Sequence, residues 1–125
     1  MTTVLVVDSD VGFAFWFGYG LSKAGYATFP AESVPSAKEL LDELEIVVVD
    51  LLIINTALPD VAGLVESLRS RYPNLTVLAL IDDQPEQNPI PEVDVRWQKP
   101  LGTDGSTRQD LILQIKKILP PLATH

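Results

Sequence analysis

Polar side chains that could do chemistry stand directly after short apolar runs of this sequence. These side chains belong to Asp8, Ser9, Asp10, Asn55 and Lys99. Carboxylate oxygens are ligands for hard cations, and a lysine ammonium group forms charge-assisted hydrogen bonds with anions. If the fold brings these groups together, they could form a site for a metal ion, a phosphate or another small anionic ligand.

The elements that must position these residues alternate between strands and helices. The sequence predicts strands at 4–7, 27–29, 51–54, 77–81 and 93–97, of which 4–7 and 51–54 are continuous apolar runs. Amphipathic patterns predict helices at 11–24, 33–44, 63–72 and 108–119. Continuous apolar strands are typical of parallel sheets buried on both faces, and right-handed crossovers favour helices on both sides. Functional groups of such α/β sheets gather at the carboxyl ends of the strands, where these polar residues stand.

The segment between the last two predicted strands breaks this alternation. The run from Asp82 to Pro91 contains three prolines within seven residues. Proline lacks the backbone donor that a helix needs, and its ring clashes with the preceding turn. We therefore predict a loop with at most one helical turn, so that the fourth helix of the pattern is shortened or lost.

The composition restricts the classes of function. The 125 residues suit one domain, which we assign to 1–121, followed by a C-terminal tail at 122–125. The absence of cysteine excludes disulfide, thiol and zinc-finger chemistry. A formal net charge of −8 argues against nucleic-acid binding, which needs clustered lysine and arginine. No apolar run approaches the roughly 18 residues of a membrane span, and the start of the chain does not resemble a signal peptide. We therefore expect a cytoplasmic protein without membrane contact.

Four segments carry a more specific pattern. Val4–Asp10 is an apolar strand closed by acidic residues, and Leu21–Tyr26 ends the first predicted helix. Asn55–Gly63 has proline and glycine four and eight residues after its first residue, and Lys99–Leu101 is a Lys-Pro dipeptide followed by an apolar residue. In this order the segments resemble the receiver domains of bacterial two-component response regulators over nearly the whole chain. The resemblance implies a flavodoxin-like, doubly wound sheet of five parallel strands in the order 2-1-3-4-5.

The resemblance also implies a phosphoryl-transfer site in which several positions have changed. In the family, an aspartate takes a phosphoryl group from a phosphohistidine, two further acids hold Mg²⁺, and a lysine neutralises the phosphoryl charge. Asp8 and Lys99 match that pattern. Asn55 occupies the acceptor position, where its neutral amide cannot form an acyl phosphate, and Ser9 replaces the second acid. Asp10 is a weak candidate for a metal ligand. We therefore expect no cofactor, with Mg²⁺ binding lost or very weak. Lys99 would then pair with Asp8 and donate a hydrogen bond to the Asn55 carbonyl.

The switch positions of the family have changed as well. Ile81 stands where a hydroxyl residue would follow the phosphate, and Arg96 stands where an aromatic side chain would turn inward. The resemblance therefore implies a pseudo-receiver that is not an enzyme. Such a module would act in phosphorelay signal transduction by binding a protein partner or itself. One alternative is a receiver that accepts phosphate at an atypical site. Another is a sensor of a small ligand or anion that uses Lys99 and the turn after Asp8.

Aromatic residues offer a possible surface for such a partner. Phe15 and Tyr19 are i, i+4 neighbours outside the predicted core face of the first helix. Alternatively, the side chains of Phe15 and Tyr19 pack under the last helix, against Ile112 or Leu113. Trp97 could add to an interaction surface, since neighbouring strand residues face opposite sides, or it could be partly buried against the last helix.

Overall fold

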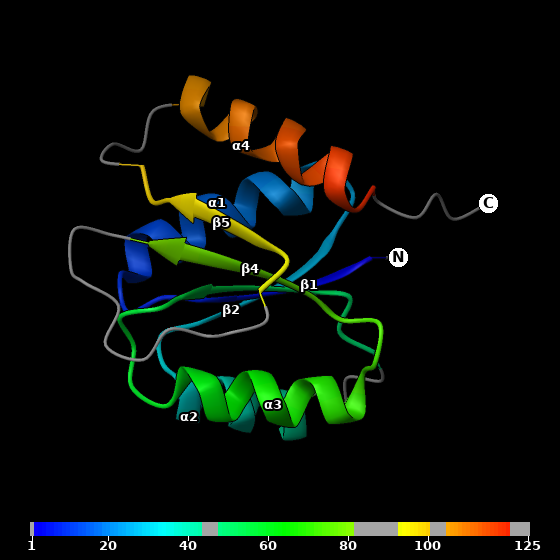
Figure 1. Cartoon of the computed structure of the whole chain (residues 1–125). Coiled ribbons are helices and arrows are strands. Elements are labelled where there is room, and N and C mark those ends of the chain that lie inside the picture. The colour runs from blue at the N-terminus through cyan, green and yellow to red at the C-terminus, as the bar shows by residue number, and fades with distance from the viewer. Residues whose placement is uncertain (1, 44–47, 82–92, 101–104, 121–125) are drawn as a thin grey trace.

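The structure is a computed structural model that describes residues 2–43, 48–81, 93–100 and 105–120 (Figure 1). The described residues contain one sheet of five parallel strands in the order β2-β1-β3-β4-β5. The strands are β1 (Thr3–Val7), β2 (Ala27–Ala31), β3 (Leu51–Asn55), β4 (Thr76–Ile81) and β5 (Val95–Gln98). This is the flavodoxin-like strand order that the sequence predicts.

Helices cover both faces of the sheet, as Figure 1 shows. One face carries α1 (Val11–Lys23) and α4 (Gly105–Ile118), and the other carries α2 (Val34–Glu43) and α3 (Val61–Arg71). The central strands are buried from both sides, because alternate residues of β1 and β3 belong to the two separate cores. Their continuous apolar sequences follow from this double burial.

The junction of α1 and β2 depends on a single glycine. Gly25 has a positive φ of 103°, which only a residue without a Cβ adopts at no steric cost. The amide of Tyr26 then donates to the carbonyl of Leu21 at 3.1 Å, which satisfies an orphan carbonyl at the end of the helix. The chain therefore turns directly from α1 into β2, the edge strand beside β1.

Element boundaries differ from the predicted ones by up to three residues. The helix α4 begins at Gly105 rather than at Arg108, and α3 begins at Val61 rather than at Gly63. The strand β2 extends to Ala31 through Pro30, which is possible because proline is tolerated on edge strands.

Some sequence predictions fall on residues that the structure does not describe. They include the proline-rich run from Asp82 to Pro91, the shortened or lost fourth helix, and the tail at 122–125. Among the described residues, no helix has the length and apolar character needed to cross a membrane.

Candidate functional site

Two neighbouring strand ends place Asp8 beside Asn55. The strands β1 and β3 pair in parallel with Val7 opposite Ile54, so the next residue of each strand lies at the same edge of the sheet. Both side chains are buried, with 0% of Asp8 and 3% of Asn55 exposed. The Nδ2 group of Asn55 donates to Oδ2 of Asp8 at 3.3 Å. The parallel register of β1 and β3 therefore brings Asp8 and Asn55 together.

Lys99 reaches this pair from the end of β5. Its backbone amide donates to the carbonyl of Ile81 at 2.7 Å, which holds the chain beside β4. Its Nζ lies 3.1 Å from Oδ2 of Asp8 and 3.6 Å from Oδ2 of Asp10. The same ammonium lies 4.7 Å from the centre of the Phe13 ring, within the range of a cation–π interaction. The expected ion pair of Lys99 with Asp8 is therefore present, and the expected hydrogen bond from Lys99 to Asn55 stays a prediction.

Asp8 accepts hydrogen bonds at both of its carboxylate oxygens. Its Oδ1 accepts from the amide of Asp10 at 2.8 Å and from Lys99 at 3.2 Å. Its Oδ2 faces the amide of Asn55 and the ammonium of Lys99. Donors within the protein therefore neutralise and satisfy this buried carboxylate, as burial of a charge requires.

Asp10 has a structural role that the sequence reasoning missed. Its Oδ1 accepts from the amide of Phe13 at 3.1 Å, so that Asp10 is the N-cap of α1. The signal was present in the sequence, because aspartate is a preferred N-cap immediately before a helix. Cap formation and the contact with Lys99 both use the carboxylate that a metal ion would need.

The amide of Asn55 is oriented by its surroundings. Its Oδ1 accepts from the backbone amide of Ala57 at 2.9 Å, which leaves Nδ2 directed at the carboxylate of Asp8. A carboxylate only accepts hydrogen bonds when it is ionised, so the NH₂ group of an amide is the complementary neighbour. An aspartate in this position would place a second acceptor against Asp8.

These residues do not fit a Mg²⁺ site. Mg²⁺ prefers carboxylates and water in octahedral geometry, whereas Asp8 already accepts from three protein groups. Ser9 is exposed and contributes no carboxylate. Among the residues that the structure describes, no three His, Cys, Asp or Glu side chains are grouped closely enough to hold a metal ion.

Ile81 and Arg96, which the resemblance assigns to the switch positions, lie at the end of β4 and on β5. Ile81 is half-buried and has no hydroxyl to follow a phosphate, and Arg96 is exposed. The next residue, Trp97, is half-buried and packs against the core beneath α1 and α4. Of the two arrangements considered for Trp97, the structure has partial burial on the side of the last helix.

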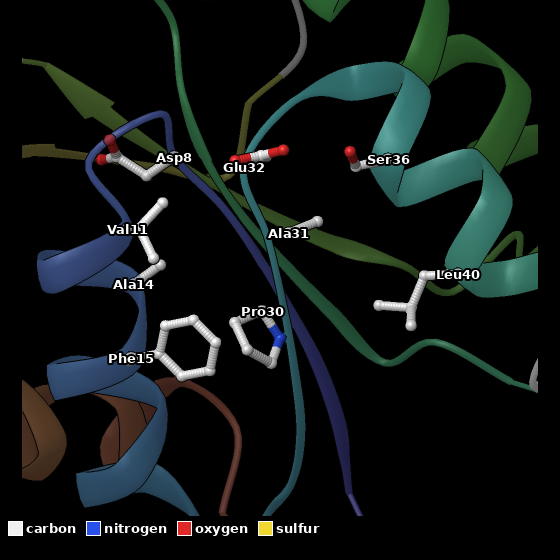
Figure 2. Close-up of a pocket in the computed structure, with 9 residues that line it drawn as sticks. All are labelled: Asp8, Val11, Ala14, Phe15, Pro30, Ala31, Glu32, Ser36 and Leu40. Carbon is white, nitrogen blue, oxygen red and sulfur yellow. The ribbon is translucent and has the colours of Figure 1, made fainter.

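Two aromatic residues of α1, Phe15 and Tyr19, are exposed, whereas Phe13 and Phe17 are buried. Phe15 is 60% exposed and Tyr19 is 55% exposed. Packing of Phe15 under the last helix is therefore wrong, because its ring lies on the other side of α1, next to Pro30 of the edge strand (Figure 2). Tyr19 lies closer to α4, where the guanidinium of Arg108 is 5.7 Å from its ring centre.

A cavity of about 260 Å³ opens beside Asp8, between α1 and α2. Figure 2 shows Val11, Ala14 and Phe15 on the side of α1, and Ser36 and Leu40 on the side of α2. Pro30, Ala31 and Glu32 lie between the two helices. Sequence reasoning missed this cavity, because its walls come from three elements whose spacing no local pattern encodes.

The structure is similar to solved response-regulator receiver domains. A CheY-like receiver domain protein from Methanospirillum hungatei JF-1 has a TM-score of 0.73 and 21% sequence identity, over 95% of this chain and 94% of that chain. An atypical orphan response regulator has a TM-score of 0.68 and 17% identity, over 99% and 100% of the two chains. An orphan response regulator of H. pylori has a TM-score of 0.68 and 17% identity, over 94% and 96%. No protein-family model and no curated protein matches the sequence.

The fold is therefore the CheY-type receiver fold, with five parallel strands in the order 2-1-3-4-5 and helices on both faces. The carboxyl ends of its strands carry the Asp8, Asn55 and Lys99 cluster described above.

Proposed function

We propose that this chain is a receiver-like signalling module that accepts no phosphoryl group and acts through protein contacts. The observation that carries the proposal is the orientation of the Asn55 amide, whose Nδ2 donates to Asp8 while its Oδ1 accepts from Ala57. A neutral amide is a poor nucleophile and cannot give the acyl phosphate that an aspartate forms. The pocket is satisfied in this form without a metal or a phosphate.

The groups around Asn55 also argue against phosphorylation at an atypical acceptor. Asp8 is fully buried, and its carboxylate is held by Lys99, by Asn55 and by the amide of Asp10. Attack on a phosphoryl donor would require all three contacts to be given up in a buried site. The hydroxyl of Thr56, the nearest sequence neighbour of Asn55, is also buried and donates to the carbonyl of Leu80 at 3.4 Å.

The anion-sensor alternative is less well supported. Lys99 is the cation that such a sensor would use, and it already faces the carboxylates of Asp8 and Asp10. An incoming anion would compete with two fixed carboxylates for one ammonium group. We therefore assign Lys99 to internal neutralisation of the pocket.

The structural neighbours support a signalling role. They are receiver domains of response regulators, and one is described as an atypical orphan response regulator with a phosphorylation-independent regulatory mechanism. By analogy with the fold, we place this chain in a cytoplasmic two-component or related pathway, as a non-enzymatic partner of another protein or of itself.

Exposure of the protein to acetyl phosphate and Mg²⁺, followed by intact-mass spectrometry, tests the proposal. We expect the mass of the wild type to stay unchanged. The matched control is the Ser9→Asp, Asn55→Asp double variant, which restores two acids beside Asp8 and Lys99 and should gain one phosphoryl group. A phosphoryl adduct on the wild type would overturn the proposal and support an atypical acceptor.

A further inference from the structure

The exposed face of α1 is unusually apolar for a chain with 17 acidic residues. Val11, Phe15 and Tyr19 follow each other at intervals of four residues and are 43%, 60% and 55% exposed. They therefore form one stripe along the helix, which we call the α1 stripe. Lys23 is the one charged residue among the thirteen of α1. Exposed aromatic side chains at helical spacing are typical anchors of protein interfaces.

The α1 stripe borders the cavity between α1 and α2. Val11 and Phe15 form one wall, Pro30 lies next to Phe15 between the two helices, and Leu40 lies across on α2, as Figure 2 shows. An apolar cavity of about 150 Å³ is large enough to bind benzene. The present cavity of about 260 Å³ can therefore take an aromatic ring. The exposed ring of Phe15 and a cavity with enough volume for such a ring therefore lie side by side on the same surface.

The two ends of the α1 stripe carry opposite charges. Asp10 and Glu32 lie at the end where α1 begins, and Lys23 lies at the end where it stops. Among the described residues, Glu32 forms no ion pair and is exposed. Lys23 is about 12 Å along the helix axis from Phe15, at 1.5 Å for each of eight residues.

We propose that a second copy of this chain docks on the α1 stripe, with the two α1 helices antiparallel about a twofold axis near Phe15. Each Phe15 ring then enters the cavity of the other copy, which gives the self-complementary contact that twofold symmetry requires. The antiparallel arrangement also brings Lys23 of each copy toward Glu32 of the other. A parallel arrangement would place like charges together.

This inference rests on the proposed function, because it names the partner of the same signalling module. The choice of a second copy follows from charge. Two copies of net charge −8 repel each other over most of their surfaces. They can therefore meet only on a face whose middle is uncharged and whose ends carry opposite charges, as the α1 stripe does. The stripe is also small, and small interfaces are typical of weak, reversible association.

Sedimentation equilibrium of the wild type from micromolar to millimolar concentration tests the proposal. We expect a reversible monomer–dimer equilibrium. The Phe15→Ser variant should associate about tenfold more weakly or worse, as expected for loss of a central aromatic anchor. Val48→Ser is the matched control, because Val48 is also exposed but precedes β3, at the opposite end of the sheet from the cavity. Its association should equal that of the wild type.

Charge exchange tests the antiparallel geometry. Lys23→Glu and Glu32→Lys should each weaken dimerisation, because each puts two like charges face to face across the twofold axis. The double variant should recover most of the wild-type association. A wild type that stays monomeric, a Phe15→Ser variant that dimerises normally, or a double variant no better than the single ones would overturn the proposed dimer. None of these results would restore a phosphoryl acceptor, so the proposed function is tested separately by the phosphorylation experiment.

Discussion

At the scale of single residues, the chemistry of the site depends on the amide of Asn55. Its two ends make different contacts, since Oδ1 accepts from Ala57 and Nδ2 donates to Asp8. An aspartate has no donor for Asp8, and two carboxylates at this distance repel unless a proton or a cation lies between them. The amide therefore replaces the cation that an acidic pair would need.

The Asn55→Asp variant should be less stable than the wild type. Loss of the hydrogen bond to buried Asp8 and the new like-charge contact should lower the free energy of unfolding by about 1–3 kcal/mol. Mg²⁺ should recover part of this loss in the variant and leave the wild type unchanged, because only the variant has carboxylates at both position 8 and position 55. Urea denaturation with and without Mg²⁺ measures both effects. Equal stabilisation of the two proteins by Mg²⁺ would show that the wild-type pocket still holds the metal.

The sequence predicted the meeting of Asp8, Asn55 and Lys99 because parallel strands end at the same edge of a sheet. It did not predict the contact of Lys99 with Asp10, or the cap that Asp10 forms. Those contacts depend on how the side chains turn at the start of α1, and strand order alone does not determine that.

At the scale of elements, α1 and α4 pack closely against each other at Gly20. A Cβ added to Gly20 would lie 2.7 Å from both Cδ of Arg108 and Cδ1 of Ile112. The guanidinium of Arg108 also lies 5.7 Å from the ring centre of Trp16 and donates to the carbonyl of Trp16 at 3.3 Å. Glycine at position 20 therefore permits α4 to approach α1 closely enough for these contacts.

Substitution of alanine at two glycines of α1 should have opposite effects. Gly20→Ala should lower the free energy of unfolding by about 1–3 kcal/mol, because the methyl group overpacks the contact with α4. Gly12→Ala should raise it by up to about 1 kcal/mol, because alanine is the better helix former and its Cβ would have an ordinary contact at 3.4 Å. Denaturant unfolding of both variants provides the comparison. Equal stability of the two variants would contradict the packing described here.

Strand and helix positions could be predicted from the sequence because their apolar patterns are local. Their ends were less predictable. The helix α3 begins two residues earlier than predicted, directly after Asp60, which has a positive φ of 64°. That conformation is uncommon for residues other than glycine, and although aspartate adopts it more readily than most, the sequence does not indicate which aspartate will do so.

At the scale of the whole molecule, the two ends of the described chain are joined. The hydroxyl of Tyr26, just before β2, donates to the carbonyl of Leu119 at 2.8 Å, and Thr2 donates to Pro120 at 3.1 Å. These contacts hold the segment after α4 against the beginning of the sheet. Tyr26 is 1% exposed, and burial raises the pKa of its hydroxyl above the usual value for tyrosine.

The stability of the protein should therefore fall in strongly alkaline solution. The unfolded chain releases the Tyr26 proton at about pH 10, whereas the folded chain retains it to higher pH. The contribution of Tyr26 is complete below about pH 10 and is lost as the pH rises through the raised pKa. Tyr26→Phe should cost about 0.5–1.5 kcal/mol at neutral pH through loss of the hydrogen bond, and should show a smaller alkaline loss. Urea denaturation of the wild type and of Tyr26→Phe across this pH range measures the alkaline loss of stability. Parallel pH profiles of the two proteins would contradict the role assigned to Tyr26.

The doubly wound architecture could be predicted because it follows from the alternation of elements and the handedness of crossovers. The cavity and the α1 stripe could not be combined into a docking surface from sequence alone. Phe15 was a candidate interaction residue from its helical position, but the hole beside it is formed by Pro30 of β2 and Leu40 of α2. Their approach to α1 is a property of the assembled molecule.

We propose that the strand-end pocket is complete without a metal or a phosphoryl group. An amide NMR titration with Mg²⁺, and then with beryllofluoride as a mimic of the aspartyl phosphate, tests it most directly. We predict that the resonances of Asp8, Asn55 and Lys99 stay unchanged throughout both additions. Saturable shifts at those residues would contradict the claim, because they would mean that the pocket still binds the ligands of a working receiver.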